Sequence, residues 1–162
     1  MGETLLIKKT KSIFDEIEKI RDRIIQRAYD LFNSNGGVLG RDLDDWLQAE
    51  RELVWKPAIE LEEKDGEFLL QVAVPGVESK DIDIEVTADD ILIKAETSHE
   101  HKETKGEVHF CEFASGNLFR SIRLPKPIDA DKVKAELKNG LLTLKAPVAA
   151  EARAKKVKVE AA

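Results

Sequence analysis

The sequence predicts an all-β protein: an immunoglobulin-like antiparallel β-sandwich with an N-terminal α-helical arm and a flexible C-terminal tail. Three observations predict this class. Apolar and polar residues alternate with a period of two through most of residues 55–147. Turn-forming dipeptides separate the alternating runs. Helical spacing of apolar residues is confined to the region before residue 55. We therefore expect an arm over residues 1–54, a sandwich over 55–147 and a tail over 148–162.

The arm is expected to contain two helices, over residues 12–34 and 42–53. Apolar residues recur every three or four positions in both, Ser12 can cap the first helix, and Asn35-Gly36-Gly37 can end it. Two amphipathic helices in so short a segment either pack on another subunit or stay partly exposed. Their apolar stripe supplies the candidates for binding unfolded proteins, namely Phe14, Ile17, Ile20, Ile24, Leu31, Phe32 and Trp46.

The clearest strand signal is the stretch AELKNGLLTLKAP. Asn139-Gly140 tolerates the two positive φ angles of a type I′ turn, so these residues predict a two-residue hairpin loop. The buried face of this hairpin is then formed by three cross-strand pairs, Leu137 with Leu142, Ala135 with Leu144, and Val133 with Ala146.

The earlier strands place carboxylates at alternate positions, at Asp81, Asp83 and Glu85. We expect a solvated strand face there, because acid–base catalysis needs paired carboxylates in a cleft. The sequence contains no Gly-rich phosphate loop and no Gly-x-Ser-x-Gly motif. It therefore predicts no catalytic residues, no cofactor and no enzyme activity.

Composition limits the partners and the cellular location that can be expected. The 162 residues carry a formal net charge of −6, which argues against a nucleic-acid partner because no concentrated basic face is evident. The single cysteine excludes an intrachain disulfide framework and fits a reducing compartment. No apolar run has membrane-spanning length and the start lacks a signal-peptide pattern, so the expected location is cytoplasmic.

Several motifs together resemble the small heat shock proteins, the Hsp20 or α-crystallin domain family of bacterial type. They are A-x-x-x-N-G-x-L from Ala135 to Leu142, Pro75-Gly76-Val77 followed by Asp81-Ile82, and G-x-x-x-R-x-x-x-L-P from Gly116 to Pro125. The resemblance covers residues 55 to 147. Separately, the span IIQRAYDLF…GRDLDDWLQAE resembles a short bacterial domain of unknown function.

The family resemblance implies an ATP-independent holdase, an oligomer of dimers that keeps unfolding proteins from aggregating. It also implies that a strand from the long loop after Thr97 is exchanged with a partner subunit. The end of that loop, residues 108–113, is apolar on both faces and would suit this role. The expected dimer-interface residues are Val108, Phe110, Cys111, Phe113 and Arg120, with Arg120 either pairing with acidic groups or simply exposed.

The tail contains a Val-x-Val motif, Val157 and Val159, for which the family implies a groove on a neighbouring subunit. Two buried valines give roughly 3–4 kcal/mol, or about millimolar affinity, so one tail would hold weakly and many would hold an exchanging oligomer. A frayed tail is the alternative. The groove would be lined by Ile82, Ile84, Val86, Val133, Ala135 and Leu137.

Two further features have competing interpretations. His99, His101, His109 and Cys111 could form a metal site, but solvated loop histidines explain the pattern better because no Cys-x-x-Cys pair is present. Cys111 is either a redox-sensitive thiol or passive. Three rival functions stay open: a monomeric co-chaperone or adaptor, a membrane-surface protein using the helix over residues 12–32, and metal-dependent catalysis.

Overall fold

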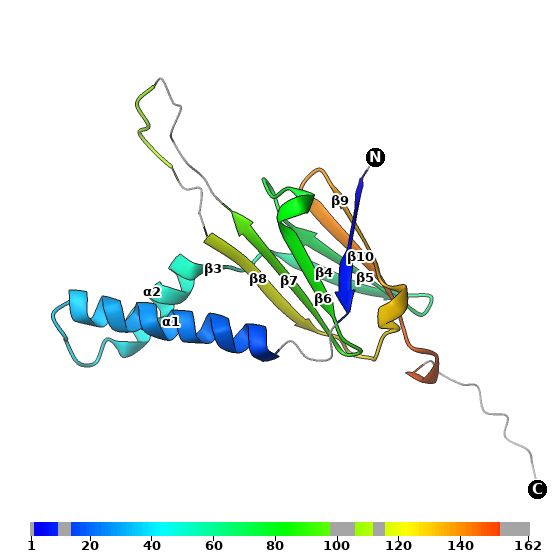
Figure 1. Ribbon diagram of the computed structural model, residues 1–162, viewed down its shortest axis with the longest axis horizontal. Helices are drawn as coiled ribbons and strands as arrows, with labels where there is room; N and C mark the ends of the chain where they lie inside the picture. The colour runs from blue at the N-terminus through cyan, green and yellow to red at the C-terminus, as the bar shows by residue number, and fades with distance from the viewer. Residues whose placement is uncertain (1, 10–13, 98–105, 112–115, 153–162) are drawn as a thin grey trace, which may run out of the picture.

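The computed structural model describes residues 2–9, 14–97, 106–111 and 116–152. Within them, strands form two five-stranded sheets that face each other (Figure 1). The first sheet contains, in spatial order, β1 (Glu3–Leu5), β9 (Lys134–Lys138), β10 (Leu141–Pro147), β5 (Glu67–Ala73) and β4 (Ile59–Lys64). The second contains β2 (Ile7–Lys9), β6 (Ile82–Val86), β7 (Asp90–Thr97), β8 (Gly116–Arg123) and β3 (Val54–Trp55). The predicted sandwich is confirmed.

The core lies between the sheets and follows from the alternation in the sequence. In β5, Phe68, Leu70 and Val72 are fully buried while the residues between them are not. Ile84 and Ile93 enter the same core from the second sheet. Short 3₁₀ turns, Ser79–Asp81, Ala130–Lys132 and Ala150–Ala152, connect or end the strands.

The Asn139-Gly140 hairpin forms with the predicted register. Both residues have positive φ, +52° and +73°, and Leu142 lies opposite Leu137 as Leu144 lies opposite Ala135. The third predicted pair lies beyond the last paired residues of the ladder, Lys134 and Lys145. Asp65-Gly66 forms a second turn with the same positive φ angles between β4 and β5.

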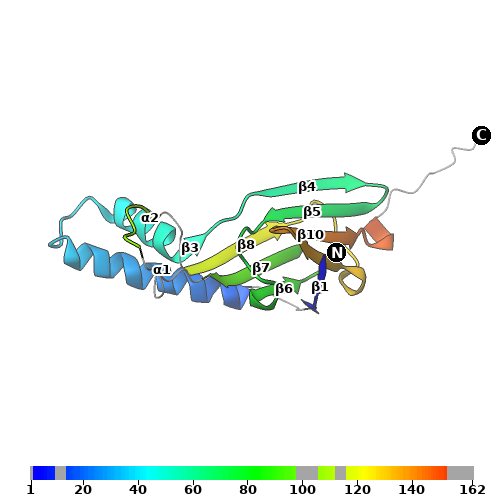
Figure 2. The same cartoon turned by 90° about the horizontal axis from the view of Figure 1, so that it is seen from above.

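Helices α1 (Phe14–Ser34) and α2 (Asp42–Leu53) form a helical hairpin that extends past one end of the sandwich (Figure 2). The predicted bounds agree, apart from residues 12 and 13, which lie outside the described residues. The helices pack on each other through Ile24 and Leu31 of α1 and Ala49 of α2. Neither described helix combines the length and hydropathy needed to cross a membrane.

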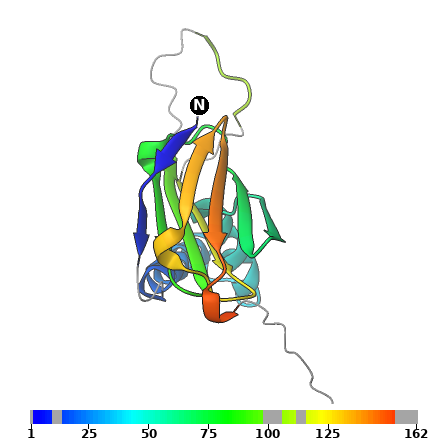
Figure 3. The same cartoon turned by 90° about the vertical axis from the view of Figure 1, so that its right-hand side faces the viewer.

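Two short strands precede α1, where the sequence analysis expected only the helical arm. β1 pairs antiparallel with β9 of the first sheet, and β2 pairs parallel with β6 of the second. One seven-residue segment, residues 3–9, therefore joins an edge of each sheet. Figure 3 shows these strands, in blue, running down one side of the sandwich.

Candidate functional site

The six residues predicted to line a groove for the tail belong to one buried cluster: Ile82, Ile84 and Val86 of β6 and Val133, Ala135 and Leu137 at β9. We call the place between these two strands, where residues 3–9 pair with both, the β6–β9 groove. β6 and β9 would be the edge strands of their sheets if β1 and β2 were removed. Both an apolar floor and unpaired backbone groups would then be available to an extended segment.

In this chain the N-terminal segment occupies the β6–β9 groove. Leu5 lies opposite Ala135 and Ile7 lies opposite Ile84, and both side chains pack against the core. Leu6, between them, points away and is 95% exposed. The segment thus presents an apolar-x-apolar pattern to the groove. The tail residues Val157 and Val159 lie outside the described residues.

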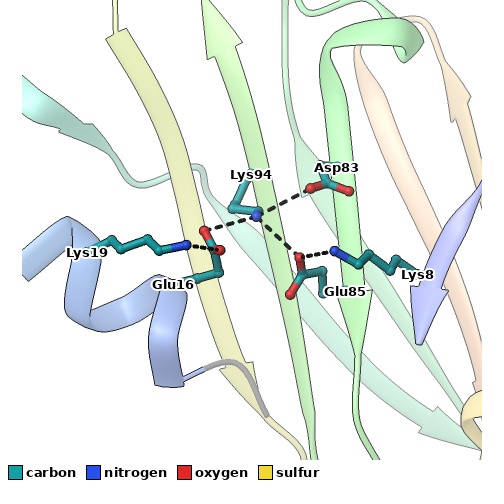
Figure 4. A network of polar contacts seen from close by, with 6 residues as sticks. All are labelled: Lys8, Glu16, Lys19, Asp83, Glu85 and Lys94. Carbon is teal, nitrogen blue, oxygen red and sulfur yellow. Dashed lines mark hydrogen bonds and ion pairs between the residues drawn. The ribbon is translucent and has the colours of Figure 1, made fainter. Parts of the chain in front are cut away.

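An ionic network lies beside this segment on the outer face of the second sheet (Figure 4). Glu85 of β6 is 4% exposed, and its Oε1 atom lies 3.4 Å from Lys8 Nζ and 3.3 Å from Lys94 Nζ. Lys94 Nζ also contacts Glu16 of α1 at 3.2 Å and Asp83 at 3.3 Å. The network therefore links the N-terminal segment, the sheet and helix α1.

The predicted solvated carboxylate face was wrong for Glu85, although Asp81 and Asp83 are exposed as expected. The reason is that Lys8, 77 residues away in sequence, and Lys94 close over the Glu85 carboxylate. Alternation along β6 alone carries no signal of such long-range partners. A buried carboxylate between two lysines satisfies the rule that buried charges are paired.

The network shifts the pKa values of its members. Hydrogen bonds from Lys19, and then from Lys94, hold the pKa of Glu16 below its usual range. Burial alone would lower the pKa of Lys94, but hydrogen bonds to Glu16 and Asp83 outweigh it and raise that pKa. Both shifts favour the charged, docked arrangement of α1 on the sheet.

The helical hairpin is closed by polar contacts at both ends. Arg27 Nε lies 2.7 Å from Glu52 Oε2, and this hydrogen bond lowers the pKa of Glu52. Near the loop, Asn35 Nδ2 donates to the buried Asp45 Oδ1 at 3.1 Å. These contacts fix which apolar residues face inward and which face solvent.

The predicted apolar stripe divides into a buried and an exposed part. Ile24 and Leu31 are buried, and Ile17, Ile20, Phe32 and Trp46 are half-buried, so of the seven candidates Phe14 is the exposed one. Other apolar side chains of the hairpin are exposed instead: Ile25, Tyr29, Val38, Leu39, Leu43 and Leu47. A cavity of about 380 Å³ lies among Ile25, Tyr29, Phe32, Leu39 and Trp46. The 3.6-residue period did not distinguish these two faces because both carry apolar residues.

The described part of the long loop, residues 106–111, pairs with no strand of the single chain. Residues 106–111 form no strand and lie away from both sheets in Figure 1. Phe110 is 93% exposed, and Val108 and Cys111 are exposed too. A strand requires a neighbouring edge, and this segment reaches none in one chain. Phe113 lies outside the described residues.

Arg120 lies on β8 opposite Ile93 and is half-buried. No ion pair joins it to another of the described residues. Of the metal candidates, His109 and Cys111 are both exposed, whereas His99 and His101 fall outside the described residues. Across the part of the chain that the structure describes, no three His, Cys, Asp or Glu side chains gather as metal ligands.

The chain was compared with protein families and with known proteins. The family model described as Hsp20/alpha crystallin family matches residues 60–160, and that of a protein of unknown function, DUF2934, matches residues 21–54. The chain is 33% identical over 103 residues to spore protein SP21 of Stigmatella aurantiaca, covering 64% of this chain and 61% of that protein. It is 30% identical over 100 residues to a probable 15 kDa heat shock protein of Leptospira interrogans, covering 62% and 75%.

Solved structures share the sandwich. Heat shock protein 16.0 from Schizosaccharomyces pombe superposes with a TM-score of 0.56 at 29% identity, covering 67% of this chain and 99% of that one. A small heat-shock protein from Xylella fastidiosa gives a TM-score of 0.53 at 25% identity, covering 66% and 98%. Each match covers about two thirds of this chain and nearly all of the other.

Proposed function

This chain belongs to the Hsp20/alpha crystallin family, and from that premise we propose that it is an ATP-independent holdase chaperone. It binds apolar segments of unfolding proteins and prevents them from aggregating. It acts without catalysis, in the cytoplasm, as an exchanging oligomer of strand-swapped dimers. Its partners are therefore copies of itself and unfolded proteins.

The observation that carries this proposal is the apolar surface of the helical hairpin. Ile25, Tyr29 and Leu39 are exposed around the cavity between α1 and α2. A folded protein that leaves such side chains together in solvent offers them to a partner. An unfolding protein exposes apolar residues in no fixed arrangement, and a shallow surface of mixed aliphatic and aromatic residues suits such a partner. The surrounding charged residues keep the complex soluble.

The assembly part of the proposal rests on two segments, residues 106–111 and the tail motif. Residues 106–111 expose Phe110 and Val108, which are costly to leave in water if they serve no contact. We assign them, with Cys111, Phe113 and Arg120, to the interface with a partner subunit whose sheet edge they extend. The Val157 and Val159 motif is assigned to a groove on another subunit, so that many weak contacts hold the oligomer.

A heat-labile protein warmed without nucleotide, with light scattering as the readout, tests the holdase function. The intact chain should suppress aggregation. The triple variant Ile25→Ser, Tyr29→Ser, Leu39→Ser should suppress it several-fold less per mole of subunit. The matched control replaces three exposed charged residues of the same hairpin, Glu18→Ser, Arg41→Ser and Asp44→Ser, and should retain full activity.

Two results would contradict the proposal. A complete lack of suppression by the intact chain would exclude the holdase function. Equal suppression by the apolar triple variant and its control would move client binding away from the hairpin and onto the sandwich.

A further inference from the structure

The β6–β9 groove already has an occupant in this chain. Residues 3–9 complete both sheets, with Leu5 and Ile7 half-buried against the groove floor and Leu6 exposed. Two side-chain contacts hold the segment at its ends. Ser79 Oγ donates to the Glu3 carboxylate, and Lys8 pairs with Glu85. Any other segment that enters the groove must first displace this one.

The N-terminal segment and the tail share the pattern that the groove accepts. Leu5-Leu6-Ile7-Lys8 has apolar residues at alternate positions with a lysine beside them, as does Lys156-Val157-Lys158-Val159 read in the opposite direction. We propose that residues 3–9 are a built-in competitor that occupies the groove until the tail of another copy displaces it. This inference rests on the proposed assignment of Val157 and Val159 to the groove.

Residues 3–9 and the tail are expected to bind the β6–β9 groove with similar strength. A segment tethered within the same chain acts at an effective concentration of about millimolar. Two half-buried apolar residues bind with a similarly weak affinity, so neither occupant excludes the other permanently. A hollow of about 490 Å³ lies beside Leu5 and Ile7, bordered by Val133 and Ala135 and by polar side chains of β9 and β10, so one side of the segment is open to solvent.

Charge selects the direction in which the tail enters. If Val159 takes the place of Leu5 and Val157 that of Ile7, Lys156 faces the buried Glu85 where Lys8 stands now. In the opposite direction Glu160 would face Glu85, and two carboxylates would meet at a buried position. The first direction sets Glu160 opposite Glu136 instead, but Glu136 is exposed and its repulsion is screened. The tail therefore runs antiparallel to the present occupant.

A labelled peptide with the sequence of residues 153–162 tests the competition by fluorescence anisotropy. All full-length chains carry Val157→Ser and Val159→Ser, so that their own tails cannot bind. With Leu5→Ser and Ile7→Ser added, the peptide should bind about tenfold more tightly than to the chain with the native segment. Leu6→Ser, at the exposed position between them, is the matched control and should change nothing. Adding peptide should also speed hydrogen exchange at the amides of residues 5–8 in the chain with the native segment, which needs no change to that segment.

The outcomes distinguish the competition by residues 3–9 from the assignment of the tail to the groove. Equal peptide affinity for the native-segment and Leu5→Ser, Ile7→Ser chains, with unchanged hydrogen exchange, overturns the competition alone. No binding to either chain overturns the tail assignment and this inference with it, while the aggregation assay still judges the holdase function. For the direction, the peptide change Lys156→Glu should weaken binding several-fold more than Lys158→Glu. If Glu160→Lys strengthens peptide binding and Lys156→Glu has no effect, the tail lies in the groove in the opposite direction.

Discussion

Lys94 Nζ lies 3.3 Å from Glu85 Oε1 and 3.2 Å from Glu16 Oε2, so one lysine joins a buried carboxylate of the sheet to the first turn of α1. Glu85 has one further partner in the same sheet, Lys8 of β2, at 3.4 Å. The lysine is itself largely buried, with a side chain 23% exposed. Lys94 thus links the docking of α1 to the buried charge of Glu85.

We expect Lys94→Met to lower the free energy of unfolding by about 2–3 kcal/mol, because it leaves Glu85 with Lys8 alone. Lys19→Met is the matched control. Lys19 contacts Glu16 as well, but its side chain is 70% exposed, so its loss should cost less than about 0.5 kcal/mol. Denaturant unfolding followed by tryptophan fluorescence measures both. Equal losses for the two variants would show that the burial of Glu85 has no energetic consequence.

The pH dependence of stability follows from two shifted groups. The pKa of Glu16 lies below its usual 4.5 in the folded protein, so its contribution is present above pH 4.5 and is lost as the pH falls through the folded value. The pKa of Lys94 lies above its usual 10.5, so its contribution is present below pH 10.5 and is lost as the pH rises through the folded value.

The measurement is the difference in melting temperature between the native chain and Glu16→Gln across the acid range. This difference should be constant above about pH 5 and shrink toward lower pH. Glu18→Gln, an exposed change on the same helix, should give a difference near zero throughout. A Glu16→Gln difference that is independent of pH would contradict the assigned contacts.

The turn glycine of the last hairpin is expected to resist substitution for two reasons. Gly140 has φ +73°, and a Cβ there would lie 3.2 Å from Pro75 Cα. Gly36 has φ +81° but open space around its Cβ position, so Gly36→Ala carries the backbone strain alone. We expect losses of about 2 kcal/mol for Gly140→Ala and about 1 kcal/mol for Gly36→Ala. Thermal unfolding compares them, and a smaller loss at Gly140 would mean that the close approach to Pro75 relaxes freely.

The proposed dimer predicts a specific effect of Phe110→Glu. A charge at this exposed position cannot be buried at a subunit interface, so the variant should shift from larger species toward monomers in light scattering. Cys111 reports the same change chemically: it should react slowly with a thiol reagent in the native assembly and quickly in Phe110→Glu. Leu141→Glu, an exposed apolar position on β10, is the control. Unchanged mass and thiol reactivity in Phe110→Glu would remove residues 106–111 from the interface.

Local signals were sufficient for much of the fold. Asn139-Gly140 predicted both a turn and the pairing of Leu137 with Leu142, because a two-residue loop fixes the register. The helix bounds followed from apolar spacing and from the glycines after Asn35. The burial of the apolar residues on β6 and β9 followed from their alternation with polar ones.

The features that the sequence did not predict all depend on contacts between different helices or strands. β1 and β2 have three residues each, too few to show alternation, and they are strands only because β9 and β6 lie beside them. The burial of Glu85 depends on Lys8 in the same way. The division of the helical stripe depends on where α2 lies against α1. Such contacts leave no periodic pattern in the strands or helices that make them.

The pairing of residues 3–9 with two sheets imposes an order on synthesis. These residues leave the ribosome well before their partners, because Ile84 follows 77 residues after Ile7 and Ala135 follows 130 residues after Leu5. The helical hairpin, whose contacts are local, can form long before either partner strand has been made. Residues 3–9 thus find their place only after later parts of the chain have folded.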